Sequence, residues 1–168
     1  YNVGNVEITV GTSYSAVGEA LSAGTADAGF ISGGTYVTYD DDCDVLLTAQ
    51  RKAINKDSLN AKDWNDGTEE AFTDNFTTYY RSIILAGPST KGQELAAKVN
   101  AGQKLTWDDL NGATWAVMGA SSASGYIYPS LWLYNNYGKQ ISDLANVVQS
   151  DSYTTSMSRL AAGQVDVI

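Results

Sequence analysis

The chain has 168 residues, with 10 basic and 19 acidic side chains and a formal net charge of −9 at pH 7. Nucleic acid and anionic membranes bind basic surfaces, so a chain this acidic excludes both as partners. The absence of histidine excludes His-dependent catalysis and His-ligated zinc, and the single cysteine, Cys43, excludes an internal disulfide.

Short strands and helices alternate along the first half of the chain. Thr12 or Ser13 is placed to cap a short helix that ends at Gly24, and a Ser-Gly-Gly-Thr turn at residues 32–35 opens another helical turn. A polar excursion at residues 55–78 is long enough that part of it should be structured or functional. The strands predicted in this half are residues 6–11, 26–31, 44–51 and 79–87, the second of them buried on both faces.

The second half follows a break at Pro88 and repeats the alternation. Thr106 and Asp109 have the spacing of a capping box, and Pro129 lies where the first turns of a helix tolerate it. The predicted helices cover residues 93–101, 106–110, 126–137 and 153–162, and the predicted strands cover residues 114–118, 146–149 and 165–168. This order indicates an α/β protein with mainly parallel sheets and flanking helices.

Two segments, residues 21–28 and 160–167, resemble each other. Each has a helix end, a glycine, a two-residue step and then an aspartate that starts a strand. The pattern is common wherever a helix leads into a strand, so it is compatible with convergence as well as with homology of the two halves. It suggests two similar α/β lobes whose loops face a shared cleft.

Residues 119–126, which we call the Ser loop, join the strand predicted at 114–118 to the helix that follows. The loop has three serines within four residues and is flanked by Gly119 and Gly125. A serine at a helix start is often only an N-cap, but three of them exceed what capping requires. Backbone N–H groups, hydroxyls and the positive end of a helix dipole meet there, which favours an anion or a polar ligand. Open α/β sheets bind ligands at this end of their strands.

These features resemble the periplasmic phosphonate-binding proteins of ABC importers. The stretches that carry the resemblance are residues 11–14 with 26–30, 80–83, 109–112 leading to 121–126, and 162–167. The resemblance implies a two-lobed periplasmic-binding-protein-like fold of type II, of which this chain would be an incomplete segment. Residues 1–87 would form lobe one without its first strand–helix–strand, and residues 88–168 would form lobe two.

In the family pattern, the Ser loop holds the phosphonate oxygens. The hydroxyls of Ser122 and Ser124 and the backbone at Ala123 and Gly125 match the groups that do so. Relatives often have threonine in the middle of this loop, so Ala123 removes one donor. The resemblance therefore predicts the position of the ligand more firmly than the identity of its substituent.

Four further residues match ligand contacts of the family. Tyr14 and Tyr80 correspond to tyrosines of the other lobe that close over the bound group. Asp166 corresponds to a late aspartate that accepts a hydrogen bond from the ligand, and Tyr153 stands where some relatives have a histidine. An aspartate in an anion site suits a ligand that carries a protonated oxygen or an ammonium, because a carboxylate only accepts.

The predicted function is therefore that of the extracytoplasmic solute-binding component of an ABC importer, either periplasmic or a surface lipoprotein. It would capture a phosphonate or a related phosphorus oxyanion, deliver it to the permease subunits, and need no cofactor or metal. No transmembrane segment is expected, since no apolar run is long enough to span a bilayer. An enzyme is not expected either, because the Ser loop has no candidate base and no Gly-x-Ser-x-Gly elbow. A ligand-sensing domain of a regulator or receptor is the alternative.

Overall fold

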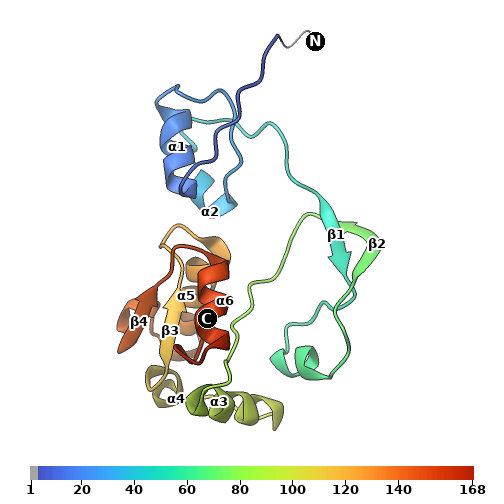
Figure 1. Cartoon of the computed structure of the whole chain (residues 1–168), viewed down its shortest axis with the longest axis vertical. Coiled ribbons are helices and arrows are strands. Elements are labelled where there is room, and N and C mark those ends of the chain that lie inside the picture. The colour runs from blue at the N-terminus through green and yellow to red at the C-terminus, as the bar shows by residue number, and fades with distance from the viewer. Residues whose placement is uncertain (1–3) are drawn as a thin grey trace.

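The computed structural model describes residues 4–168, so the first three residues of the predicted lobe 1–87 lie outside it. We call residues 4–87 the N-terminal region and residues 88–168 the C-terminal region. In Figure 1 the helices of the C-terminal region gather around strands β3 and β4, whereas the N-terminal region consists of a pair of helices and a separate hairpin.

The C-terminal region has the predicted alternation of strands and helices. Its elements are α3 (Thr90–Asn100), α4 (Trp107–Asn111), β3 (Thr114–Val117), the π-helical turn η2 (Ala123–Ile127), α5 (Tyr128–Tyr137), η3 (Ile141–Asp143), β4 (Asn146–Gln149) and α6 (Tyr153–Ala161). Strands β3 and β4 are parallel, with Thr114 opposite Asn146. Val167 bridges Trp115 in parallel on the other side of β3 and bridges Ala86 in the antiparallel sense. The predicted parallel arrangement is therefore present in this region.

A core of apolar side chains lies between this sheet and its helices. Trp115, Leu133 and Val167 are almost completely buried, and they belong to a cluster that also includes residues from α3 and α4. The indole N–H of Trp115 donates to the carbonyl oxygen of Leu110 at 2.9 Å, so burial leaves this polar group satisfied. Tyr126, the last residue of the Ser loop, packs against this core.

Local signals in the sequence determine where these helices begin and end. The helix predicted at 93–101 begins earlier, at Thr90, because the hydroxyl of Ser89 caps it. The capping box of Thr106 and Asp109 is present. Helix α5 ends at Gly138, whose φ of 65° lies in the left-handed region that favours glycine.

The N-terminal region contains α1 (Tyr14–Ser22), α2 (Gly33–Tyr36), β1 (Arg51–Ile54), the short helix η1 (Ala61–Asn65) and β2 (Phe72–Thr77). Ser13 and Ser32 cap α1 and α2 through hydrogen bonds to backbone N–H groups of their first turns. The polar excursion is structured, as expected. Strands β1 and β2 pair antiparallel with Arg51 opposite Thr77, and η1 lies between them in the sequence.

The strands predicted at residues 6–11 and 26–31 are wrong. Neither segment pairs as a strand in the described residues, and Phe30, expected to be buried, is 93% exposed. The strand predicted at 44–51 contributes only its last residue, to β1, and that predicted at 79–87 pairs only near its end. A strand is stable when neighbouring strands satisfy its backbone groups and cover its faces. These segments lack such neighbours.

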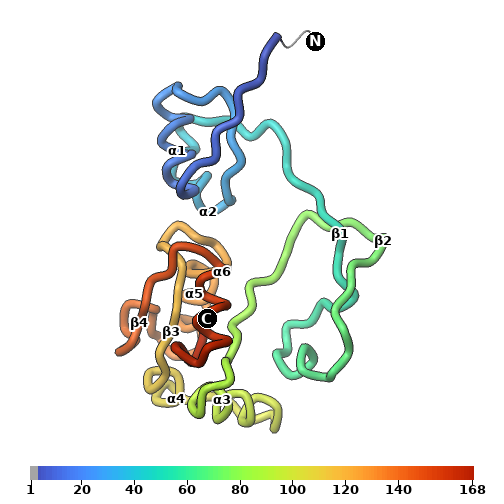
Figure 2. The backbone as a smooth tube through the Cα atoms, viewed as in Figure 1, coloured from blue at the N-terminus to red at the C-terminus, as the bar shows by residue number. Residues whose placement is uncertain are grey.

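One connection joins the two regions along the chain. Figure 2 shows it running from β2 past the C-terminal residues to α3. Leu85 and Ile168 exchange two backbone hydrogen bonds of 2.9 and 3.0 Å, and the N–H of Gly87 donates to the carbonyl oxygen of Asp166 at 2.8 Å. The last part of this connection is therefore tied to the edge of the C-terminal sheet.

Candidate functional site

The Ser loop leaves the carboxyl end of β3 and folds back on itself before α5. Ser122 is the N-cap of η2, and its buried hydroxyl accepts a hydrogen bond from the N–H of Gly125 at 3.3 Å. The N–H of Met118 donates to the carbonyl oxygen of Gly125 at 3.1 Å. A Cβ atom at position 125 would lie 2.4 Å from the Met118 side chain, so only glycine fits this turn.

Three hydroxyl groups meet in this loop, and we call them the hydroxyl cluster. The phenolic oxygen of Tyr153 lies 2.9 Å from Ser122 Oγ and 2.6 Å from Ser124 Oγ. Tyr153 is the first residue of α6, whose N-cap is Ser152. The starts of two helical segments, η2 and α6, therefore converge on the cluster. Both present partial positive charge from their unpaired N–H groups.

The hydrogen-bond arrangement leaves donors for a ligand. The two contacts within the hydroxyl cluster use two of its three hydroxyl hydrogens, so one hydrogen is left to donate. The sequence-based expectation used the backbone at Gly125, but that N–H already donates to Ser122. The N–H groups of Ala123 and Ser124, in the first turn of η2, have no protein acceptor among the described residues. Such an arrangement is suited to an oxyanion.

The starts of α1 and α2 lie against the Ser loop, as Figure 1 shows for α2. The hydroxyl of Ser15 donates to Ser121 Oγ at 3.3 Å, and the buried hydroxyl of Thr35 lies 3.5 Å from the carbonyl oxygen of Ser121. Tyr14 precedes Ser15 at the start of α1 and is about half exposed. The structure thus brings the element that carries Tyr14 to the loop, without a hydrogen bond from Tyr14 itself.

Tyr80 lies two residues before Ser82, which contacts the Ser loop, but the Tyr80 ring packs against Arg51. Ser82, two residues later, donates from its hydroxyl to the carbonyl oxygen of Ser124 at 2.7 Å. The ring of Tyr80 lies under the guanidinium of Arg51, whose Cζ is 5.7 Å from the ring centroid. Both line a cavity of about 360 Å³ between the hairpin and residues 79–83. The hydroxyl cluster and the Tyr80 ring are therefore not in contact.

The structure does not bring Asp166 to the Ser loop. Its Oδ2 accepts from the N–H of Thr114 at 2.7 Å, and its Oδ1 accepts from the hydroxyl of Ser89 at 2.5 Å. Thr114 begins β3, whereas the Ser loop follows the other end of that strand. Asp166 thus ties the start of β3 to the N-cap of α3, with one hydrogen bond to each of its oxygens.

Sequence reasoning missed Ser15, Thr35 and Ser82, all of which contact the Ser loop. Thr35 had a signal, since it belongs to the recognised Ser-Gly-Gly-Thr turn. Ser15 and Ser82 had none, because a serine that bonds to a distant segment looks like any other serine. Their contacts depend on how the two regions meet.

Clusters of metal-ligating side chains and membrane-spanning helices were sought in the described residues. No group of three or more His, Cys, Asp or Glu side chains gathers as metal ligands would within residues 4–168. None of the helices in this part of the chain has the length and apolar character needed to cross a bilayer. The donors identified at the Ser loop are neutral hydroxyl and backbone N–H groups.

Comparison with known proteins places the chain in a family. Neither the curated proteins nor the solved structures contain a match. A family model, "ABC transporter, phosphonate, periplasmic substrate-binding protein", matches residues 4–168. The match confirms the resemblance found in the sequence and does not support the alternative of a regulatory sensing domain. The chain therefore belongs to the periplasmic substrate-binding proteins of phosphonate ABC transporters, a family that binds solutes outside the cytoplasm and is not enzymatic.

Proposed function

We propose that the Ser loop is the anion-holding element of this substrate-binding protein, and that its ligand is a phosphonate or a related phosphorus oxyanion. The observation that carries the proposal is the hydroxyl cluster of Ser122, Ser124 and Tyr153 at the starts of two helical segments. The remaining hydroxyl hydrogen and the N–H groups of Ala123 and Ser124 would donate to the ligand oxygens. The protein would then deliver the ligand to its permease subunits.

Neutral donors are a physically reasonable way to hold this ligand. Hydrogen bonds to an ionised acceptor are about twice as strong as those between neutral groups. The net charge of −9 repels an anion at long range, so affinity must come from short-range donors such as these. A site without buried cations also avoids leaving an unpaired charge when the ligand departs.

Closure of two lobes around the ligand is the second part of the proposal. The N-terminal region would act as one lobe and the C-terminal region as the other, with residues 79–87 as a hinge crossing. The contacts of Ser15 and Thr35 with Ser121 support this, since they link the two regions at the Ser loop. Tyr14 would cover the ligand from the opposite side. Tyr80 would do so only if its ring leaves Arg51.

Isothermal titration calorimetry tests the ligand class. The protein is titrated with 2-aminoethylphosphonate, methylphosphonate, phosphite and phosphate, and we expect binding of at least one. No heat with any of the four would contradict the proposal. Preference for a phosphonate over phosphate would show that the site also recognises the organic substituent.

Replacement of one hydroxyl tests the site. We expect Ser124→Ala to weaken binding by on the order of 1–3 kcal/mol, because a buried ligand oxygen and the Tyr153 hydroxyl each lose a partner. Ser158→Ala is the matched control, since this serine is exposed on α6 and makes no side-chain hydrogen bond in the described structure. Equal affinity of the two variants would remove the Ser loop from the binding site.

A further inference from the structure

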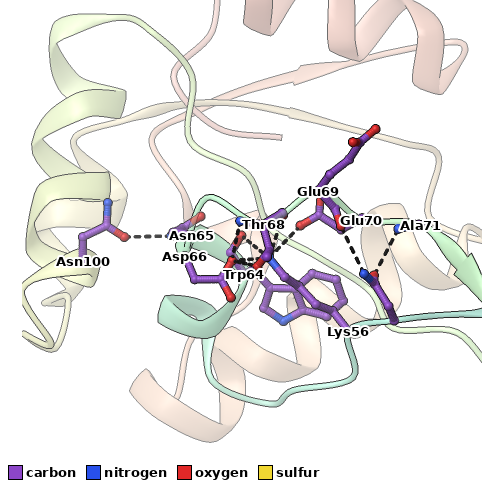
Figure 3. Close-up of polar contacts among 10 residues, drawn as sticks. Lys56, Trp64, Asn65, Asp66, Thr68, Glu69, Glu70, Ala71 and Asn100 are labelled. Carbon is purple, nitrogen blue, oxygen red and sulfur yellow. Dashed lines mark hydrogen bonds and ion pairs between the residues drawn. The ribbon is translucent and has the colours of Figure 1, made fainter.

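Part of the polar excursion is organised around one ammonium group, which we call the Lys56 cage (Figure 3). The Nζ atom of Lys56 lies 2.7 Å from Asp66 Oδ1 and 3.0 Å from Glu70 Oε1. It also donates to the carbonyl oxygens of Thr68 at 3.2 Å and Trp64 at 3.4 Å. Only 12% of the Lys56 side chain is exposed. Protein oxygens have thus replaced most of the water around this charge.

The cage stays charged near neutral pH. Hydrogen bonds from Lys56 hold the pKa values of Asp66 and Glu70 below the ordinary carboxyl range, and the bond to Asp66 raises the pKa of Lys56. Asn55 adds support by donating to the carbonyl oxygen of Glu69 at 3.1 Å. The excursion therefore has a defined shape, although most of its residues are exposed.

The cage presents one residue to the C-terminal region. Asn65 is the last residue of η1 and immediately precedes Asp66 of the cage. Its Nδ2 donates to Oδ1 of Asn100, the last residue of α3, at 2.8 Å (Figure 3). Among the described residues, this is the hydrogen bond that joins the excursion to the C-terminal region.

This contact and the Ser loop lie at different ends of the C-terminal region. Helix α3 begins beside the first residue of β3, through the bonds of Asp166 to Ser89 and Thr114. The Ser loop follows the last residue of β3. Figure 1 shows the same separation, with α3 at the end of the region remote from α2. Residues 82–87 bond to the Ser loop and to the end of the chain. The rest of the described N-terminal region forms hydrogen bonds to the C-terminal region at two separated places, the Ser loop and Asn100.

We propose that the Asn65–Asn100 contact positions the two regions relative to each other and thereby sets ligand affinity from a distance. The inference rests on the proposed function, in which ligand binds between the regions. The Asn65–Asn100 contact and the Ser15–Ser121 hydrogen bond are present together in one arrangement of the two regions. Removing the Asn65–Asn100 hydrogen bond lowers the fraction of molecules in that arrangement. The apparent affinity for the ligand falls in proportion to that fraction.

Substitutions at Asn100 test the proposal without touching the Ser loop. We expect Asn100→Ala to weaken binding of the best oxyanion roughly 2–5-fold, since a single exposed hydrogen bond is lost. Asn100→Trp inserts a bulky side chain against η1 and should weaken binding at least about tenfold. The matched controls are Asn135→Ala and Asn135→Trp, at an exposed asparagine of α5. We expect their affinity to equal that of the unaltered protein.

A double-mutant cycle separates positioning from general loss of stability. Lys56→Met dismantles the cage and should weaken binding about as much as Asn100→Ala, because both act through the same contact. Combining them should then cause little further loss. Fully additive losses in the double variant would overturn the proposal, as would an unchanged affinity of Asn100→Trp.

Small-angle X-ray scattering of the unliganded protein gives a readout that does not depend on a ligand. We expect the radius of gyration of Asn100→Trp to exceed that of the unaltered protein and of Asn135→Trp. If none of the four oxyanions binds, the proposed function fails while the scattering still tests the contact. An unchanged radius of gyration would overturn the positioning role.

Discussion

Residues 21–28 and 160–167 have nearly the same sequence pattern but different structures. Both begin as helix ends, and both helices stop at a glycine in the left-handed region, with φ of 68° at Gly24 and 66° at Gly163. After the glycine they diverge. Val167 is 2% exposed in the C-terminal region, whereas the segment that follows Gly24 is mostly exposed.

The difference comes from the neighbours of each segment. Residues 165–168 lie between β3 and residues 85–87, with which they form backbone hydrogen bonds. Residues 26–31 have no strand beside them in the described chain. A helix and its cap satisfy their backbone groups locally, but a strand depends on a partner elsewhere in the sequence. One local pattern therefore produced the same helix end twice and a paired strand once.

The largest expected effect comes from removing a buried side chain of the C-terminal core, compared with an exposed side chain of the N-terminal region. We expect Leu133→Ala to lower the free energy of unfolding by about 2–5 kcal/mol, because this side chain is fully buried. Leu131→Ala in the same helix is the control, since Leu131 is half exposed. Leu47→Ala in the N-terminal region should change the free energy of unfolding by less than about 0.5 kcal/mol, because Leu47 is exposed. Urea denaturation measures all three, and a large loss for Leu47→Ala would break the comparison.

Substitutions at Gly24 and Gly163 test whether two helix ends with the same local structure contribute equally to stability. Alanine in the left-handed region costs about 1–2 kcal/mol, so Gly163→Ala should lower the free energy of unfolding of the C-terminal region by that amount. Gly24→Ala should instead increase amide exchange in α1, which lies outside the main core. Gly33→Ala is the control, because a Cβ there meets no atom and its φ is not positive. Equal global losses at positions 24 and 163 would show that α1 unfolds together with the core.

Acid should produce the smallest effect. The hydrogen bond from Lys98 at 2.5 Å, with the backbone bond from Thr106, lowers the pKa of Asp109 to about 2. A depressed carboxyl pKa stabilises the fold above the ordinary carboxyl range, and this contribution is lost as the pH falls toward about 2. Lowering the pH from 5 to 2.5 should therefore decrease the denaturation midpoint of the unaltered protein more than it decreases the midpoint of Asp109→Asn. Asp108→Asn, in the same helix, should keep the full pH dependence.

Helix boundaries were the most predictable part of the fold. The Thr106–Asp109 capping box acts within a few residues and was identified correctly from the sequence. Thr12 and Ser13 were the two candidates for the cap of α1, and Ser13 is the one that the structure shows. Strands were less predictable. Those at β3 and β4 were correct, whereas the strands predicted at residues 6–11 and 26–31 did not form.

The candidate site was predictable to a similar degree. The concentration of serines identified the Ser loop, and the resemblance placed Tyr153 there. The topology explains why Asp166 does not lie at the Ser loop. Asp166 precedes Val167, which runs parallel to β3, so it lies at the amino end of that strand. The Ser loop lies at the carboxyl end.

The sequence by itself determined the helices, their caps, the family and the Ser loop, because these depend on neighbouring residues or on a motif of fixed order. Only the tertiary structure decided which predicted strands pair, that Tyr153 bonds to both Ser122 and Ser124, and that Asn65 meets Asn100. Those contacts join residues far apart in the chain. Their formation depends on the packing of distant segments against one another, which no local pattern encodes.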